Sequence, residues 1–289
     1  MRITNSMMIN NMLRNMSANL NRLDKYQSQL ATGRKIRVPS DDPVGASRSL
    51  RARTDLARNQ QYAKNVDDAM SWLDMTESSL TELNSVLQRA KEITVQGANG
   101  SLADEDRQKV AQELEQLKQH VLQVGNNKYA DRYIFAGTKT TAEPFASDGT
   151  YNGNDGAIEY NIGPANSIKV NITGNDVDIT GIYNLLNTVQ QGLEGDDSVN
   201  LSAQLGELEK KLDNVLEQRA AVGARANRAE LVKNRLADDD ITFNQLLANV
   251  EDVDIAAVSI KISEARFVYE ASLLSASRII QPSLADFLR

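Results

Sequence analysis

Apolar residues recur along most of this chain in alternating steps of three and four positions, in five separate stretches. In the first stretch, six of the seven positions are apolar: Ile9, Leu13, Met16, Leu20, Leu23, Gln27 and Leu30. The last stretch has the same spacing: Leu246, Val250, Val253, Ala257, Ile260, Glu264, Phe267, Ala271 and Leu274. This spacing is typical of long helices that lie nearly parallel and share an apolar seam. We therefore expect the two terminal stretches to be antiparallel partners, or at least neighbours.

Three further stretches of this kind lie between the terminal ones, over residues 66–90, 110–124 and 201–236. Proline breaks helices, and the chain has only five prolines, none of them inside these stretches. The pattern therefore predicts a mainly α protein, a long antiparallel helical bundle or coiled coil formed by the N- and C-terminal halves.

The expected ends of the helices follow from residues with known positional preferences. Gly33 is expected to end the first helix, because glycine readily adopts the left-handed conformation found there. Ser40 or Asp41 is expected to cap the second helix, with Pro43 in its first turn. A break or bend is expected at residues 237–245, between the last two stretches.

The middle of the chain has a different character, because nine of the sixteen glycines lie within residues 137–195. Two short segments with alternating apolar residues, 157–162 and 167–172, predict strands separated by turns. The sequence thus indicates three parts: terminal helices (1–40 and 250–289), a long-helix core (41–139 and 181–249), and a small β-rich insert (140–180).

The last helix carries more apolar surface than one partner helix requires. Beside its main stripe, further apolar residues lie on other sides: Ile255, Val258, Ile262, Ala265, Val268 and Tyr269. A helix that packs against a single neighbour needs only one stripe. Two interpretations stay open: the helix is buried on several sides within its own bundle, or it contacts other subunits.

Charge is distributed unevenly along the chain. The first 60 residues carry 11 basic and 4 acidic side chains, although the net charge of the whole chain is −7. The basic region could indicate nucleic-acid binding, but it is poor in aromatic residues and has a heptad stripe. We expect no nucleic-acid partner. We expect either solvated faces or complementary patches that orient partners: Arg34, Lys35, Arg37, Arg48 and Arg51 against Asp238, Asp239, Asp240, Glu251 and Asp252.

Candidate chemistry is sparse in this sequence. Residues 148–159 nearly match the calcium loop of an EF-hand, but Thr150 interrupts the ligand spacing and the flanks predict strands rather than helices. A calcium-dependent binding module is kept as an alternative. His120 is the only histidine and there is no cysteine, so we expect no catalytic residues, metal, cofactor or enzymatic activity.

Neither a membrane nor a secretory leader is indicated. No apolar run approaches the roughly 18 residues of a membrane-spanning helix. The first 16 residues are rich in asparagine and lack the apolar segment of a secretory signal, so we expect no cleaved leader and no membrane partner.

Several motifs nevertheless resemble a known family. They are `LATGRKIRVPSDDPVGASRSLRART` (30–54), `VQGANGSLADEDR` (95–107), `YIFAGTKTTAEPF` (133–145) and `FNQLLANVEDVDIAAVSIKIS` (243–263). Together with the terminal helix, they resemble the flagellin superfamily. Within it, the two prolines around the acidic pair and the `YIFAGTKTTAEPF` segment are most similar to the hook-associated proteins of type 3, which form the hook–filament junction. Flagellin, the filament subunit, is the alternative.

The resemblance implies a structural protein of the bacterial flagellum, located outside the cell after type III export. It implies that the termini form an inner coiled coil and that the β-rich insert faces outward. The implied partners are other copies of the chain, the hook-associated protein of type 1, flagellin or the filament cap, and a flagellar export chaperone.

We expect the assembly interface to lie on the terminal helices. Its candidate residues are Ile9, Leu13, Met16, Leu20, Leu23, Leu30, Ile260, Phe267, Leu274, Ile279 and Phe287.

Overall fold

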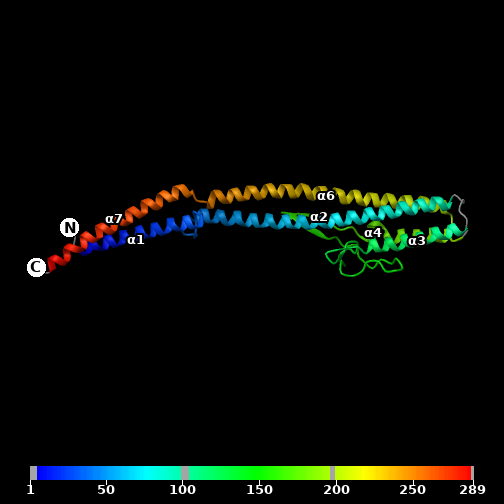
Figure 1. Ribbon diagram of the computed structural model, residues 1–289, viewed down its shortest axis with the longest axis horizontal. Helices are drawn as coiled ribbons and strands as arrows, with labels where there is room; N and C mark the ends of the chain where they lie inside the picture. The colour runs from blue at the N-terminus through cyan, green and yellow to red at the C-terminus, as the bar shows by residue number, and fades with distance from the viewer. Residues whose placement is uncertain (1–4, 99–103, 196–198, 288–289) are drawn as a thin grey trace. The chain divides into compact units, whose positions relative to one another are not determined.

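The computed structural model describes residues 5–98, 104–195 and 199–287, and the side chains of residues 6–98, 105–195 and 199–277 (Figure 1). Most described residues are helical. The helices are α1 (Asn5–Thr32), α2 (Pro43–Ala98), α3 (Asp104–Gly125), α4 (Gly174–Val177), α5 (Ile179–Leu193), α6 (Leu201–Glu251) and α7 (Ile255–Phe287). The strands are β1 (Lys128–Tyr129), β2 (Arg132–Tyr133), β3 (Glu159–Gly163) and β4 (Asn166–Lys169). The predicted mainly α fold with a small β-rich region is confirmed.

The chain folds into two compact units. Unit 1 combines Met1–Arg58 with Asp240–Arg289, and unit 2 is Asn59–Asp239. Helices α2 and α6 each contribute residues to both units, and the β-rich segment lies within unit 2. The three-part division expected from the sequence therefore stays a proposal beside these two units.

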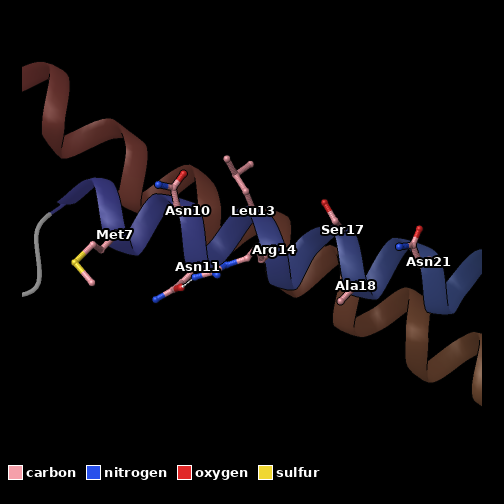
Figure 2. A pocket seen from close by; sticks show the side chains of 8 residues that line it. All are labelled: Met7, Asn10, Asn11, Leu13, Arg14, Ser17, Ala18 and Asn21. Atoms are coloured by element: carbon pink, nitrogen blue, oxygen red, sulfur yellow. Dashed lines mark hydrogen bonds between the residues drawn. The ribbon is translucent and has the colours of Figure 1, made fainter.

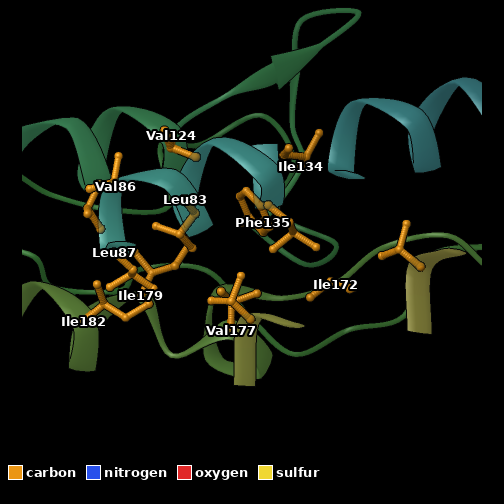
Figure 3. Packing of buried hydrophobic residues seen from close by; sticks show 14 of the residues in the cluster. Leu83, Val86, Leu87, Val124, Ile134, Phe135, Ile172, Val177, Ile179 and Ile182 are labelled. Atoms are coloured by element: carbon orange, nitrogen blue, oxygen red, sulfur yellow. The ribbon is translucent and has the colours of Figure 1, made fainter. Parts of the chain in front are cut away.

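The predicted apolar stripe of α2 forms the core of unit 2. All eight of its positions are at most 1 % exposed: Val66, Ala69, Leu73, Thr76, Leu80, Leu83, Leu87 and Ala90. Figure 3 shows how α2 residues such as Leu83 converge with Val124 of α3, Phe135 after β2 and Ile182 of α5. The heptad pattern in this part of the chain was sufficient to identify the buried face.

The β-rich segment consists of two small antiparallel pairs, β1 with β2 and β3 with β4. The strands predicted at 157–162 and 167–172 are confirmed by β3 and β4. Gly137 has a φ of +66°, and a Cβ atom there would lie 1.9 Å from the carbonyl oxygen of Asn154. Only glycine fits this close approach, which holds the loop before Asn154 against the segment that follows β2.

The calcium-loop candidate at 148–159 is an irregular segment that ends at the start of β3. An isolated bridge joins Phe145 to Tyr151, and the Asp148 carboxylate accepts a hydrogen bond from the Thr150 backbone N–H at 2.9 Å. The Asn154 side-chain oxygen likewise accepts from the Thr138 backbone N–H at 2.7 Å. Across the part of the chain that the structure describes, no cluster of three His, Asp or Glu residues is placed to hold a metal ion.

The expected break at residues 237–245 is wrong. These residues contain neither proline nor glycine, and α6 continues through them to Glu251. The helix stops only at residues 252–254, and Asp254 then caps α7 by accepting a hydrogen bond from the Ala257 backbone N–H at 3.1 Å. Gly33, with a φ of +68°, follows the end of α1 as predicted.

The N-cap of α2 is Asp42 rather than Ser40 or Asp41. The Asp42 carboxylate accepts from the backbone N–H groups of Val44 and Gly45 at 3.1 and 2.9 Å. Asp41 instead closes the preceding loop, because it accepts from Lys25 at 3.1 Å and from the backbone of Arg37 at 3.3 Å. Two adjacent aspartates thus have different structural roles.

Replacing Asp42 by alanine is expected to lower the free energy of unfolding by about 1 kcal/mol, because two backbone donors lose their acceptor. Thermal unfolding followed by circular dichroism measures the loss. Asp42→Asn is the matched control, since asparagine caps helices equally well. An equal loss in both variants would contradict the capping role.

Candidate assembly surface

Helices α1 and α7 lie side by side and run antiparallel, with both chain ends at the same end of the pair (Figure 1). Between Ile9 and Tyr26, and between Val258 and Ala276, the residues that are not exposed recur in steps of three and four. On α1 they are Ile9, Met12, Met16, Asn19, Leu23 and Tyr26. On α7 they are Val258, Ile262, Ala265, Tyr269, Ser272 and Ala276. These two sets form the seam between the helices, which we call the inner seam.

The inner seam differs from the stripe predicted on α7. Ile260, Phe267 and Leu274 are 62 %, 73 % and 66 % exposed. At 100° per residue they lie on the side of α7 opposite the inner seam. The prediction that this stripe forms the seam with α1 was wrong, because α7 has apolar residues on several sides, so that more than one stripe fits the heptad pattern. As assembly candidates, the same three residues stay a prediction. We call Ile260, Phe267 and Leu274 the outer stripe.

The candidate residues of α1 divide in a similar way. Ile9, Met16 and Leu23 belong to the inner seam. Leu13 and Leu20 are 45 % and 49 % exposed on its flank. A further candidate on α1, Leu30, is 40 % exposed. The side chains of two candidates on α7, Ile279 and Phe287, lie outside the described residues. Unit 1 therefore buries one apolar stripe within the chain and leaves others uncovered.

The far side of α1 is polar. Figure 2 shows a shallow hollow along this side, lined by Met7, Asn10, Asn11, Leu13, Arg14, Ser17, Ala18 and Asn21. Arg14 donates a hydrogen bond to the side-chain oxygen of Asn11 within it. Five of these eight residues are polar, so this side of α1 suits contact with water better than contact with an apolar partner, and Leu13 lies at its border with the apolar flank.

The carboxylate of Glu251, the last residue of α6, is buried and binds several side chains. Glu251 is 5 % exposed. Its side chain accepts from Arg53 Nε and Nη2 at 2.7 and 2.5 Å and from the Ser49 hydroxyl, and Arg34 Nε lies 3.6 Å away. The hydrogen bond from Arg53 lowers the pKa of the Glu251 carboxyl below its usual range, and burial opposes that shift. The same contact raises the pKa of Arg53.

Backbone hydrogen bonds also join the loop after α1 to the end of α6. The Lys35 N–H donates to the Glu251 carbonyl at 2.6 Å, and the Val253 N–H donates to the Gly33 carbonyl at 3.0 Å. An isolated antiparallel bridge joins Arg34 to Asp252. The loop after α1 and the break between α6 and α7 therefore hold each other in place.

The structure brings together only part of the predicted charge pairing. Arg34 meets Glu251 and Asp252 within the chain, whereas Arg48 and Arg51 are exposed. Lys35 meets Glu251 through its backbone N–H at 2.6 Å. Two candidates have other partners: Arg37 donates to the Ser28 hydroxyl at 3.2 Å, and Asp240 accepts from Asn244 at 2.9 Å. Asp238 and Asp239 belong to unit 2.

The strongest partner of Glu251, Arg53, was missed by the sequence reasoning. It lies four residues after Ser49, and both donate to the same carboxylate. This spacing places Arg53 and Ser49 on one face of α2. It was the feature of the sequence from which a shared polar partner could have been predicted.

Comparison with known proteins places the chain in a family. The profile described as the bacterial flagellin N-terminal helical region matches residues 3–140. Flagellar hook-associated protein 3 of Escherichia coli K12 is 27 % identical over 282 residues, which cover 88 % of this chain and 89 % of that protein. The family model and this relative both point to the flagellin superfamily. Flagellin of Bacillus subtilis 168 is 26 % identical over 290 residues and covers 94 % of both chains.

A solved structure supports the same conclusion. The crystal structure of Bacillus cereus FlgL superposes with a TM-score of 0.62 at 26 % sequence identity, covering 68 % of this chain and 99 % of that one. In this chain, the motif at 30–54 contains the loop after α1, the Asp42 cap and both donors to Glu251, Ser49 and Arg53. The motif at 133–145 contains Gly137 and the buried Phe135 and Phe145. The resemblance therefore rests on residues with structural roles.

Proposed function

We propose that this protein is a structural subunit of the bacterial flagellum that joins the hook to the filament. The similarity to hook-associated protein 3 over nearly the full length of both chains supports this function. The likeness to FlgL at 26 % identity adds to it. Flagellin is the less supported alternative, because the solved structures with the stronger likeness are those of hook-associated proteins rather than of flagellin. The proposed role involves no catalysis.

The observation that carries the assembly role is the uncovered outer stripe of α7. Three large apolar side chains at seven-residue intervals are each more than 60 % exposed. Such a stripe on a regular helix has the geometry of a coiled-coil seam without its partner. The proposed occupant is a neighbouring copy of this chain, whose α1 offers the similarly spaced and exposed Leu13 and Leu20.

This contact joins different surfaces on the two copies, so it is heterologous and can build a ring or helical array. In this arrangement the inner-seam residues Ile9, Met16 and Leu23 do not contact the neighbour. They hold α1 on α7 within each subunit. Arg48 and Arg51 are exposed charges that can orient neighbours, because complementary charges set register and partner choice more than affinity. The terminal helices form the proposed inner layer, and the segment 140–180 forms the proposed outer part.

The proposed neighbours in the flagellum are the hook-associated protein of type 1 on one side and flagellin or the filament cap on the other. An export chaperone is the proposed partner before assembly, and the proposed location is outside the cell. Within the described residues, no helix is long and apolar enough to cross a membrane.

Electron microscopy of cells that lack this protein tests the proposal. We expect intact hooks without filaments, and filaments restored by the intact gene. Cells that keep both hooks and normal filaments would refute the junction function. Cells whose filaments consist of this protein would identify it as flagellin instead.

A further inference from the structure

The inner seam contains one polar pair. The side-chain nitrogen of Asn19 donates to the hydroxyl of Ser272 at 3.0 Å. The Ser272 hydroxyl in turn donates to the Val268 carbonyl within α7 at 2.7 Å. Both residues occupy seam positions, and neither is exposed. A single polar pair in an otherwise apolar seam is the device by which coiled coils fix the register and the choice of partner.

The face of α7 that meets α1 is the less apolar of its two stripes. It includes Ala265, Ser272 and Ala276, with only Val258, Ile262 and Tyr269 as larger residues. The outer stripe presents Ile260, Phe267 and Leu274, and it stays exposed. Burial of apolar area alone favours the larger side chains. Some other interaction must therefore direct α1 to the weaker face.

Asn19 supplies a reason for this choice. At the height of Ser272, the outer side of α7 presents Ala271 and Leu274, since neighbouring residues differ by only about 1.5 Å along the axis. Neither residue has a side-chain acceptor for the Asn19 amide. The exposed Glu270 is at the same height but lies about 60° from the centre of the outer stripe, on its flank. Packing α1 on the outer stripe would therefore bury the Asn19 amide between apolar side chains without a partner in the seam, which is unfavourable.

We propose that the Asn19–Ser272 pair selects the face of α7 that packs on α1, and thereby keeps the outer stripe free for a neighbouring subunit. The selection within one chain is a property of the monomer. Its use in assembly rests on the proposed function. The pair makes the inner seam less apolar. It also prevents α1 from covering the outer stripe of its own chain.

The chain has no cysteine, so single introduced thiols report the exposure of each face. Ala265→Cys places a thiol in the inner seam, where the residue is 7 % exposed, and Phe267→Cys places one on the outer stripe, where it is 73 % exposed. The rate of maleimide labelling of each variant is measured on dilute, monomeric full-length protein. The Phe267→Cys variant should react much faster than the Ala265→Cys variant.

Asn19→Leu is then added to both reporters. We expect the ratio of the two labelling rates to fall by about tenfold or more, because α1 now also packs on the outer stripe. Asn21→Leu is the matched control: the same substitution on the polar far side of α1 (Figure 2) should leave the ratio unchanged. The exchanged pair Asn19→Ser with Ser272→Asn should restore the original ratio, because it keeps one amide and one hydroxyl in contact.

An unchanged ratio in Asn19→Leu would overturn the proposal. Fast labelling of both thiols would also overturn it, because that result means that α1 has left α7 rather than changed faces. Because the readout uses monomers, it is independent of the hook–filament test. A changed ratio in a protein that is dispensable for filament attachment would support the face selection and refute the junction function.

Discussion

Phe267→Glu is expected to leave the monomer folded and to abolish self-assembly. Phe267 is 73 % exposed, and substitutions at exposed sites change the free energy of unfolding by no more than about 0.5 kcal/mol. In the assembled state, the same substitution replaces a buried aromatic ring with an unpaired carboxylate. The lost burial alone is worth about 3 kcal/mol per contact, so the critical concentration for assembly should rise by about 100-fold or more. Sedimentation of purified protein over a concentration series measures it.

Leu231→Glu provides the matched control for this experiment. Leu231 is 71 % exposed and lies on α6, in unit 2, so the same change in charge and size occurs outside the outer stripe. Its critical concentration should stay close to that of the original protein. Normal assembly of Phe267→Glu, or equal impairment of both variants, would show that the outer stripe of α7 is not the interface.

Glu251→Gln is expected to destabilise unit 1 at neutral pH by about 2 kcal/mol, because the carboxylate loses its charge-assisted hydrogen bonds with Arg53. Arg53 is partly exposed, with 43 % of its side chain accessible, so water compensates part of the loss. Urea unfolding followed by circular dichroism at pH 7 measures the shift in midpoint. Glu264→Gln, an exposed glutamate on α7, should show no comparable shift.

The effect of Glu251→Gln should depend on pH in a defined direction. The pKa of Glu251 in the folded chain lies below its ordinary value of 4.5. The carboxylate therefore contributes its full stabilisation above pH 4.5 and loses it as the pH falls through the lowered pKa. The difference in urea midpoint between the original protein and Glu251→Gln should accordingly be largest at neutral pH and shrink in that acidic range. A difference that grows on acidification would contradict the assignment.

The amino-acid sequence by itself determined the helical character of this protein and the buried face of α2. From Val66 to Ala90 every position of the predicted stripe is apolar or small, and the period of the helix places these residues on one side. The end of α1 at Gly33 and the two strands of the insert also followed from local preferences, because each depends on the backbone conformation of a few adjacent residues. The family motifs could likewise be recognised from their residues alone.

Only the tertiary structure decided which face of α7 is buried and where α6 ends. The heptad pattern of α7 admits two stripes, and a contact with Asn19 on a distant helix distinguishes them. The end of α6 depends on hydrogen bonds with the loop at Gly33 and Lys35, more than 200 residues away. The side-chain partner of Glu251, Arg53, is likewise on a distant helix, α2. Local periodicity carries no information about such long-range polar contacts, because their energy exists only once the segments meet.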